Sequence, residues 1–242
     1  PHDGTSWAPL VPYLPSTPLT ADLPATGRSS PTSADPGTWL AAALAAANTA
    51  AAPLLVGHSL GAATILEHVA AGGQARAVVL ISPFFLQRPA PWALRAPFAP
   101  ALLRRATAAR LAGTARDAAL DGATEPVYQA SARNLRRGGV ARALARTLRR
   151  TSTRAARGRL QQLLDTIDLP VVVVAGDRDP LVTATRHPVT VVPGAGHDVH
   201  ITHPAAVAQS LRRLDWPFDF EHWLAQPLLR RDLLWPWADE LA

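Results

Sequence analysis

Cysteine, methionine and lysine are all absent from the 242-residue chain. Without cysteine, the chain can form no disulfide, offer no thiolate to a metal and use no cysteine nucleophile. Without methionine it has no initiator residue, and it begins at Pro1 in a stretch that is typical of a loop. We therefore expect a fragment or a processed form, in which a targeting signal would lie upstream.

Long apolar runs are missing as well. The sequence has no stretch of about 18 uncharged apolar residues, so we expect no transmembrane segment and a cytoplasmic protein. Hydrophobic residues still make up 48% of the chain, which is ample for a core. The length fits one larger α/β domain with an insert.

Because lysine is absent, all 24 basic residues are arginine, and the net charge is +6. Sixteen of these arginines lie within residues 84–164, which carry a charge of about +13. Doublets such as Arg104-Arg105 and Arg149-Arg150 suggest contact with nucleic acid, but they lack interleaved aromatic residues and a recognised binding module. We interpret them as solvated helix faces and expect no nucleic-acid partner.

The clearest motif is Gly57-His58-Ser59-Leu60-Gly61. The apolar run before it favours a buried strand, and residues 62–71 favour a helix. A serine at such a sharp turn has a strained backbone and an exposed hydroxyl, and the helix directs its free N–H groups at a developing oxyanion. We expect both glycines to be required, because a Cβ at either would collide with the neighbouring strand or helix. The alternative is a plain turn with a surface serine.

Strands that alternate with helices predict a mostly parallel, doubly wound α/β sheet covered on both faces. Besides the strand before Ser59, we expect strands over residues 18–23, 77–83, 169–175 and 189–192, and helices over residues 37–48 and 204–214. Ser33 or Asp35 would cap the first of these helices, with Trp39 and Leu40 on its buried side.

These elements divide the chain into a core over residues 1–83 and 165–214 and an inserted helical region over residues 84–164. Two amphipathic helices are expected in the insert, one with Leu103, Ala106 and Leu111 on its apolar face and one with Val140, Leu144 and Leu148. The tail, residues 215–242, holds four of the seven tryptophans. It is predicted to dock as a helix, to contact a second copy or a membrane surface, or to begin a further domain.

A serine nucleophile needs a histidine to take its proton and an acid to hold that histidine. Both follow predicted strands. Gly176-Asp177-Arg178-Asp179-Pro180 comes after the strongest strand, and Gly194-Ala195-Gly196-His197 comes after the last. Open α/β sheets keep their chemistry at the carboxyl ends of the strands. The order Ser59, Asp179, His197 therefore predicts a catalytic triad.

On these motifs the chain resembles the α/β-hydrolase superfamily, with serine esterases and lipases as its nearest type, over roughly residues 1–214. A fourth likeness is Asp22-x-Pro24-x-x-Gly27-x-Ser29, which is similar to a loop of that family with Ala25 in place of its usual first glycine.

The resemblance implies that Ser59 is the nucleophile, His197 the general base and Asp179 its orienting acid. It also implies that the backbone N–H of Leu60 is one oxyanion donor and that the insert over residues 84–164 is a lid above the substrate pocket.

Other residues compete for these roles. Asp177 is a second candidate acid, but Asp179 occupies the family's Asp-Pro position. His197, His200 and His203 are spaced three apart and offer a possible metal site. The proline after His203 and the missing acidic or cysteine ligands argue against that site, so we expect neither a metal nor an organic cofactor.

Two features depart from the family. Its members carry His-Gly-x about nine residues before a tryptophan such as Trp7, which would place that motif just before Pro1. We therefore expect the first strands and the second oxyanion donor to be missing, with His2-Asp3-Gly4 a poor substitute; such a donor is typically worth ~10²–10³ in rate. In addition, only 18 positions separate Asp179 from His197, enough for a loop or a single helical turn.

The predicted activity is hydrolysis of a small-molecule carboxylic ester, thioester or lactone through an acyl-enzyme, with an anionic or lipid-like substrate left open. Cofactor-free haloperoxidase-like members of the family use the same nucleophile for perhydrolysis. The alternative is a catalytically impaired protein, or a non-enzymatic binding protein on a hydrolase fold. No oligomeric state is predicted.

Overall fold

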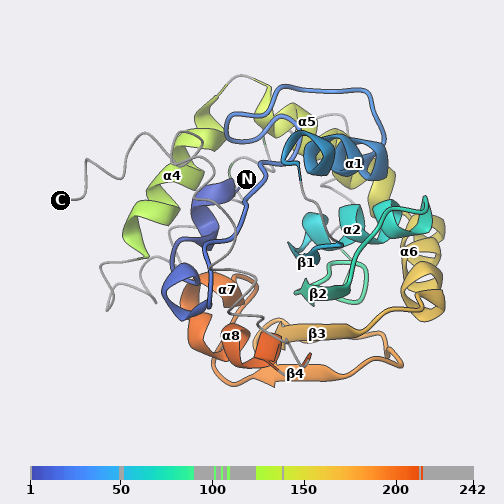
Figure 1. Cartoon of the computed structure of the whole chain (residues 1–242). Coiled ribbons are helices and arrows are strands. Elements are labelled where there is room, and N and C mark those ends of the chain that lie inside the picture. Colours follow the sequence, from blue (N-terminus) through green and yellow to red (C-terminus); the bar gives the residue numbers. More distant parts are fainter. Residues whose placement is uncertain are drawn as a thin grey trace.

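The computed structural model describes residues 2–48, 52–89, 101, 105, 108, 109, 124–137, 139–212 and 214. Its centre is one parallel sheet in the order β1-β2-β3-β4 (Figure 1). The four strands are β1 (Leu54–His58), β2 (Ala77–Ile81), β3 (Val171–Gly176) and β4 (Val189–Val192). Each coincides with a predicted strand. The further strand predicted over residues 18–23 is wrong, because that stretch has no strand pairing in the part of the chain described.

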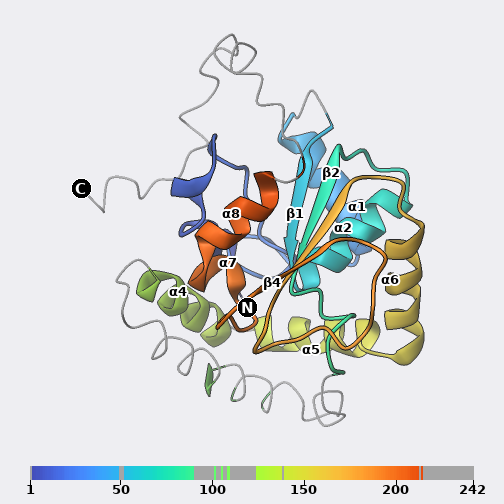
Figure 2. The same ribbon diagram turned by 90° about the horizontal axis from the view of Figure 1, so that it is seen from below.

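Helices cover both faces of the sheet, as Figure 2 shows. Alternate side chains of the central strands enter two separate cores: Val78 and Val173 belong to one, and Val79 and Val174 to the other. All residues of β2 and β3 are buried, which explains their uninterrupted apolar sequence. The predicted fold class, a parallel sheet covered on both faces, is confirmed.

The first core lies under three helices, which are α1 (Pro36–Ala46), α2 (Leu60–Ala70) and α6 (Arg154–Thr166). Asp35 caps α1 by accepting a hydrogen bond from the N–H of Thr38, and Leu40 is buried while Trp39 is partly buried, as predicted. The second core lies under the N-terminal segment and α8 (Pro204–Arg212). None of the described helices combines the length and the apolar character needed to cross a bilayer.

Two helices of the insert, α4 (Glu125–Arg136) and α5 (Val140–Thr151), lie beyond the carboxyl ends of the central strands (Figure 2). On α5, Leu144 and Leu148 pack around Ala145, as the predicted apolar face requires. The other predicted helix of the insert, with Leu103, Ala106 and Leu111, lies outside the described residues, as does the tail over residues 215–242.

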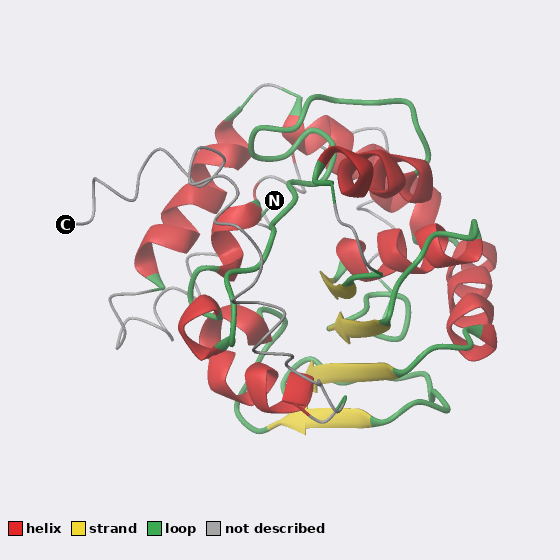
Figure 3. Ribbon diagram, viewed as in Figure 1, coloured by secondary structure: helices red, strands yellow, loops and turns green. Residues whose placement is uncertain are grey.

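The connection from β3 to β4 is a loop without a helix, drawn in green in Figure 3. It is fastened to the segment after β2: the N–H of Val182 donates to the carbonyl oxygen of Leu86 at 2.8 Å, and Gln87 forms an antiparallel bridge with Leu181. The short distance in sequence between Asp179 and His197 is therefore accommodated by a loop that a neighbouring segment holds in place.

The N-terminal segment contains two 3₁₀ turns, η1 (Gly4–Trp7) and η2 (Val11–Tyr13). Asp22 joins the two ends of this segment, because its carboxylate accepts hydrogen bonds from the N–H groups of Gly4 at 2.6 Å and Arg28 at 2.7 Å. Ala25 in this loop has φ 64°, a conformation that favours glycine. This explains why the similar family loop has a glycine at that place.

Candidate active site

The strand-to-helix turn has the geometry that the motif predicts. Ser59 follows β1 directly and is the N-cap of α2, with φ 54° and ψ −107°. This conformation is strained for a residue with a side chain. A hydrogen bond from its N–H to the carbonyl oxygen of Ile81 at 2.9 Å holds it in place. The side chain is half-buried, and the N–H of Leu60 belongs to the first turn of the helix, where no intrahelical acceptor exists.

The two glycines of the motif differ in their surroundings. A Cβ on Gly57 would lie 2.6 Å from the carbonyl carbon of Gly61 and 2.7 Å from the Ile65 side chain, so β1 and α2 approach too closely for any larger residue. A Cβ on Gly61 would have nothing within 4 Å among the described residues. The prediction is therefore correct for Gly57 and wrong for Gly61, which points away from the sheet.

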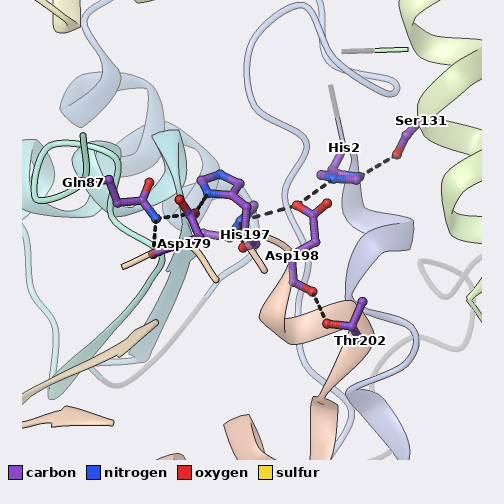
Figure 4. A network of polar contacts seen from close by, with 8 residues as sticks. His2, Gln87, Ser131, Asp179, His197, Asp198 and Thr202 are labelled. Atoms are coloured by element: carbon purple, nitrogen blue, oxygen red, sulfur yellow. Dashed lines mark hydrogen bonds and ion pairs between the residues drawn. The ribbon is translucent and has the colours of Figure 1, made fainter. Parts of the chain in front are cut away.

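Asp179 and His197 meet at the carboxyl edge of the sheet. The Nδ1 of His197 lies 2.5 Å from Oδ2 of Asp179 (Figure 4). Because an ionised carboxylate only accepts, Nδ1 carries the proton and Nε2 keeps a free lone pair. The side chains are 17% exposed for His197 and 31% exposed for Asp179, so solvent and small molecules reach the pair. Asp177, the other candidate acid, is exposed.

Gln87 is a residue of this site that the sequence did not reveal. Its Nε2 donates to Oδ2 of Asp179 at 2.5 Å, the same oxygen that His197 contacts. Arg157 of α6 in turn donates to the backbone oxygens of Phe84 and Gln87. A glutamine six residues after a strand carries no motif, and it contacts Asp179 only because the loops after β2 and β3 are paired.

The structure brings Asp179 and His197 together but forms no hydrogen bond between the hydroxyl of Ser59 and His197 in the part of the chain described. The neighbouring residue makes the contact instead. The Nε2 of His58 donates to the carbonyl oxygen of His197 at 3.0 Å, and the two rings are 4.7 Å apart. Ser59 is therefore the residue after His58, whose side chain contacts the loop that carries His197.

Behind the pair lies a histidine cluster, defined here as His2, His58, His200 and the carboxylate of Asp198. The Nε2 of His2 lies 3.3 Å from Oδ1 of Asp198, and its Nδ1 accepts from the hydroxyl of Ser131 at 2.6 Å (Figure 4). The rings of His58 and His200 are 4.4 Å apart. The sequence singled out His58 and His200 separately but gave no sign that they would meet.

Burial keeps two members of this cluster uncharged. It lowers the pKa of His200 to about 3, with the nearby imidazoles of His2 and His197 adding to the effect and Asp198 opposing it. Burial also holds the pKa of His58 well below its usual range, reinforced by His200 and His197. Both imidazoles are therefore neutral at pH 7.

Polar contacts fasten α4 over this cluster. Besides the bond between Ser131 and His2, the amide of Asn134 donates to Oδ2 of Asp3 at 2.6 Å, and the guanidinium of Arg137 donates to the backbone oxygen of Gly27. The N–H of Gly4 is already bound by Asp22. This N–H group is therefore not free to serve as an oxyanion donor.

One group of possible metal ligands exists among the described residues. A ring nitrogen of His58, a ring nitrogen of His197 and a carboxylate oxygen of Asp198 lie within 4.8 Å of one another. The set that the sequence suggested, His197 with His200 and His203, is not gathered in this way. The Nδ1 of His203 contacts the hydroxyl of Thr202 instead.

The sequence profile described as the alpha/beta hydrolase family matches residues 1–210. The chain belongs to this family. The match confirms the resemblance inferred from the motifs and covers most of the chain. A comparison with curated proteins found no match.

Solved structures of related hydrolases share the fold. An E-2-(acetamidomethylene)succinate hydrolase has a TM-score of 0.62 and 23% identity, covering 88% of this chain and 87% of that one. The N-acyl homoserine lactonase AidH, in a mutant bound to N-hexanoyl homoserine lactone, has a TM-score of 0.60 and 17% identity, covering 88% of this chain and 86% of that one. The esterase RhEst1 from Rhodococcus sp. ECU1013 has a TM-score of 0.56 and 18% identity, covering 89% of this chain and 87% of that one. At these identities the likeness establishes the fold.

Proposed function

We propose that this member of the α/β hydrolase family is a serine hydrolase that cleaves a carboxylic ester through an acyl-enzyme. Ser59 is the nucleophile, His197 the general base and Asp179 the acid that orients it. The observation that carries the proposal is the 2.5 Å contact between Nδ1 of His197 and Asp179, at the sheet edge where Ser59 caps α2. Ser59 follows β1 directly, and Asp179 and His197 lie in the loops after β3 and β4.

The chemistry follows from the protonation of this pair. Asp179 holds the proton of His197 on Nδ1, so Nε2 accepts the proton of the Ser59 hydroxyl while its oxygen bonds to the substrate carbonyl carbon. The resulting oxyanion is stabilised by the N–H of Leu60 and the positive end of α2. Nε2 returns the proton to the departing alcohol, leaving an acyl-serine. Water, deprotonated by the same nitrogen, then releases the acid and restores the serine.

An esterase and an N-acyl homoserine lactonase are among the structural neighbours, and the class of substrate is proposed from the chemistry of their reactions. Esters, thioesters and lactones each present a carbonyl carbon with a leaving oxygen or sulfur, and one mechanism serves them all. Residues 84–164 are proposed to form the lid, because α4 is bonded to the N-terminal segment beside His197 and Asp198. We expect the substrate to be a small molecule that enters beneath this insert.

A non-catalytic binding role is the second candidate, and one observation favours it. Among the described residues, the hydroxyl of Ser59 makes no hydrogen bond to His197. Catalytic hydrogen bonds are often long without substrate and tighten when it binds, so this geometry is compatible with both roles.

Turnover of p-nitrophenyl butyrate, a thioester and a γ-lactone by the wild-type chain tests the proposal. We expect hydrolysis of at least one, with loss of activity in Ser59→Ala. Folding of the variant is verified by circular dichroism. Activity that survives in a folded Ser59→Ala protein rejects the role of Ser59, and a folded wild-type chain that hydrolyses none of the three supports the binding role.

A further inference from the structure

Three metal-binding donors converge beside the proposed catalytic base. They are one ring nitrogen each from His58 and His197 and a carboxylate oxygen from Asp198, all within 4.8 Å of one another. Imidazole and carboxylate are the ligands that Zn²⁺ accepts alongside thiolate. The three come from the end of β1 and the loop after β4, two segments that the sheet holds in register.

The spacing is close to that of a tetrahedral zinc site. With bonds of ~2.0–2.2 Å, the ligand atoms of such a site lie ~3.3–3.5 Å apart. Oδ1 of Asp198 is 3.8 Å from Nε2 of His58, and 3.3 Å from Nε2 of His2 (Figure 4). Small side-chain rotations close the first gap, whereas His2 borders the group through Asp198 and is not one of its three donors.

A second observation comes from His200. Its imidazole is fully buried, and neither ring nitrogen has a hydrogen-bond partner in the described structure. The centroid of its ring lies 4.4 Å from that of His58, with the two ring planes tilted by 39°. A metal ion binds imidazole through a ring nitrogen that carries no proton. Metal binding at Nε2 of His58 shifts its proton to Nδ1 and replaces the hydrogen bond to the carbonyl oxygen of His197.

The effect of a bound metal on catalysis depends on Nε2 of His197. Nδ1 is bound to Asp179, so the only lone pair that His197 can offer a metal is the one on Nε2. That same lone pair removes the proton of Ser59 in the proposed mechanism. His197 is 17% exposed, which leaves the ion a path to the site.

We propose that His58, His197 and Asp198 form a Zn²⁺ site, and that Zn²⁺ bound there reversibly inhibits the enzyme. The binding site stands on its own geometry, whereas the inhibition rests on the proposed hydrolase function. The ion is an inhibitor that competes for one lone pair, and hydrolysis itself does not require it.

The first test measures binding without any substrate. The full chain, as wild type and as Ser59→Ala, is titrated with Zn²⁺ against a chromophoric chelator, and with Co²⁺ to record the visible bands of a tetrahedral site. We expect one equivalent bound equally by both proteins, with Mg²⁺ failing to compete. Absence of Zn²⁺ binding to the folded wild-type chain overturns the proposal, whether or not the chain hydrolyses esters.

Matched variants locate the site. Asp198→Asn is expected to weaken Zn²⁺ binding at least about tenfold, as loss of a ligand or its support typically does. Asp177→Asn, an exposed acid of the same region, is expected to leave it unchanged, as is His203→Gln. Equal affinity in wild type and Asp198→Asn contradicts the proposal. If Asp198→Asn does not fold, X-ray absorption of Zn²⁺-loaded wild type decides: two or more imidazole ligands support the site, and fewer overturn it.

Inhibition is measured last, by the rate of p-nitrophenyl butyrate hydrolysis with and without Zn²⁺ and after addition of EDTA. We expect loss of activity that EDTA reverses and that follows the binding curve. A chain that binds Zn²⁺ through Asp198 but never hydrolyses esters keeps the metal site and loses the proposed function. A chain that hydrolyses esters at the same rate with Zn²⁺ bound refutes the inhibitory role.

Discussion

The ends of β1 and β2 have similar backbone features, but the serines that follow them differ in their exposure to solvent. Each strand is followed by a serine with a positive φ, 54° at Ser59 and 45° at Ser82. The N–H of each donates to the neighbouring strand, Ser59 to Ile81 at 2.9 Å and Ser82 to Val174 at 2.7 Å. Beyond these shared features, Ser59 is half-buried and starts α2, whereas Ser82 is 0% exposed.

Because Ser59 and Ser82 share a positive φ, this backbone conformation alone does not identify a nucleophile. Ser82 also has a positive φ, but its hydroxyl is buried and has no hydrogen-bond partner in the described structure. What distinguishes Ser59 is the helix start behind it and the solvent in front of it. Each prediction below contrasts a residue of the candidate site, or of the packing under it, with a similar residue elsewhere.

The largest contrast is between the two serines themselves. Ser59→Ala is expected to lower kcat at least ~10⁴-fold, because the atom that attacks the carbonyl is removed. Ser82→Ala is expected to keep the wild-type rate and an equal or higher Tm, because it removes a hydroxyl that is buried without a partner, a cost of ~1–3 kcal/mol. Steady-state kinetics and thermal unfolding of both variants measure this. Loss of activity in a folded Ser82→Ala protein would contradict the account.

The second contrast is between two aspartates of one loop. Asp179→Asn is expected to lower kcat about 10⁴-fold, because the amide stabilises the wrong tautomer of His197. Asp177→Asn, at an exposed position, is expected to change the rate less than about threefold. Kinetics on p-nitrophenyl butyrate distinguish them. The reverse order would assign the acid to Asp177.

Much of the candidate site could be predicted from the sequence, because its residues belong to short motifs. A strand that ends in Gly-x-Ser-x-Gly, an Asp-Pro turn and a Gly-x-Gly-His turn each carry their signal within a few residues. The parallel sheet then brings their carboxyl ends together by topology. Gln87 and the histidine cluster have no such signal, because their contacts join segments that are far apart in the chain. The strand predicted over residues 18–23 failed for a related reason: Asp22 there binds the N-terminal segment.

Gln87 gives the third contrast, against Gln129 on the exposed side of α4. Gln87→Leu is expected to lower kcat about 10- to 100-fold with little change in KM, because a hydrogen bond to a charged group is worth ~1.5–3 kcal/mol. Gln129 is exposed and donates to Glu125 at 2.9 Å, away from Asp179, so Gln129→Leu should leave kcat unchanged. A Gln87→Leu protein in which KM rises while kcat stays constant would exclude a role in positioning Asp179.

The two motif glycines give the fourth contrast, in stability. Gly57→Ala is expected to lower the free energy of unfolding by about 1–3 kcal/mol, since its Cβ would press into Gly61 and Ile65. Gly61→Ala is expected to be neutral or to raise it by ~0.5–1 kcal/mol, because alanine is the better helix former and the space is open. Urea unfolding measures both. A destabilised Gly61→Ala protein would instead support the expectation that both glycines of the motif are required.

The last prediction concerns the pH dependence of stability and the buried imidazole of His200. Because burial lowers the pKa of His200 to about 3, the folded chain does not take up the proton that the unfolded chain binds below pH ~6.5. The stability due to neutral His200 is complete above that pH and is lost as the pH falls towards 3, by at most ~1.4 kcal/mol per pH unit. His58, whose pKa is also lowered, adds to the slope. Urea unfolding from pH 7 to 4 should show a shallower dependence in His200→Leu, and an unchanged slope would contradict the account.

The most direct measurement is the site of covalent labelling by a fluorophosphonate, a reagent that captures serines activated by a neighbouring base. The folded wild-type chain is treated with the reagent, digested and sequenced by mass spectrometry, with Asp179→Asn and Ser82→Ala treated in parallel. The account predicts one adduct, on Ser59, formed as fast in Ser82→Ala as in wild type and far more slowly in Asp179→Asn. An adduct on another residue, or no adduct on a folded chain, would contradict the claim that Ser59, His197 and Asp179 act together.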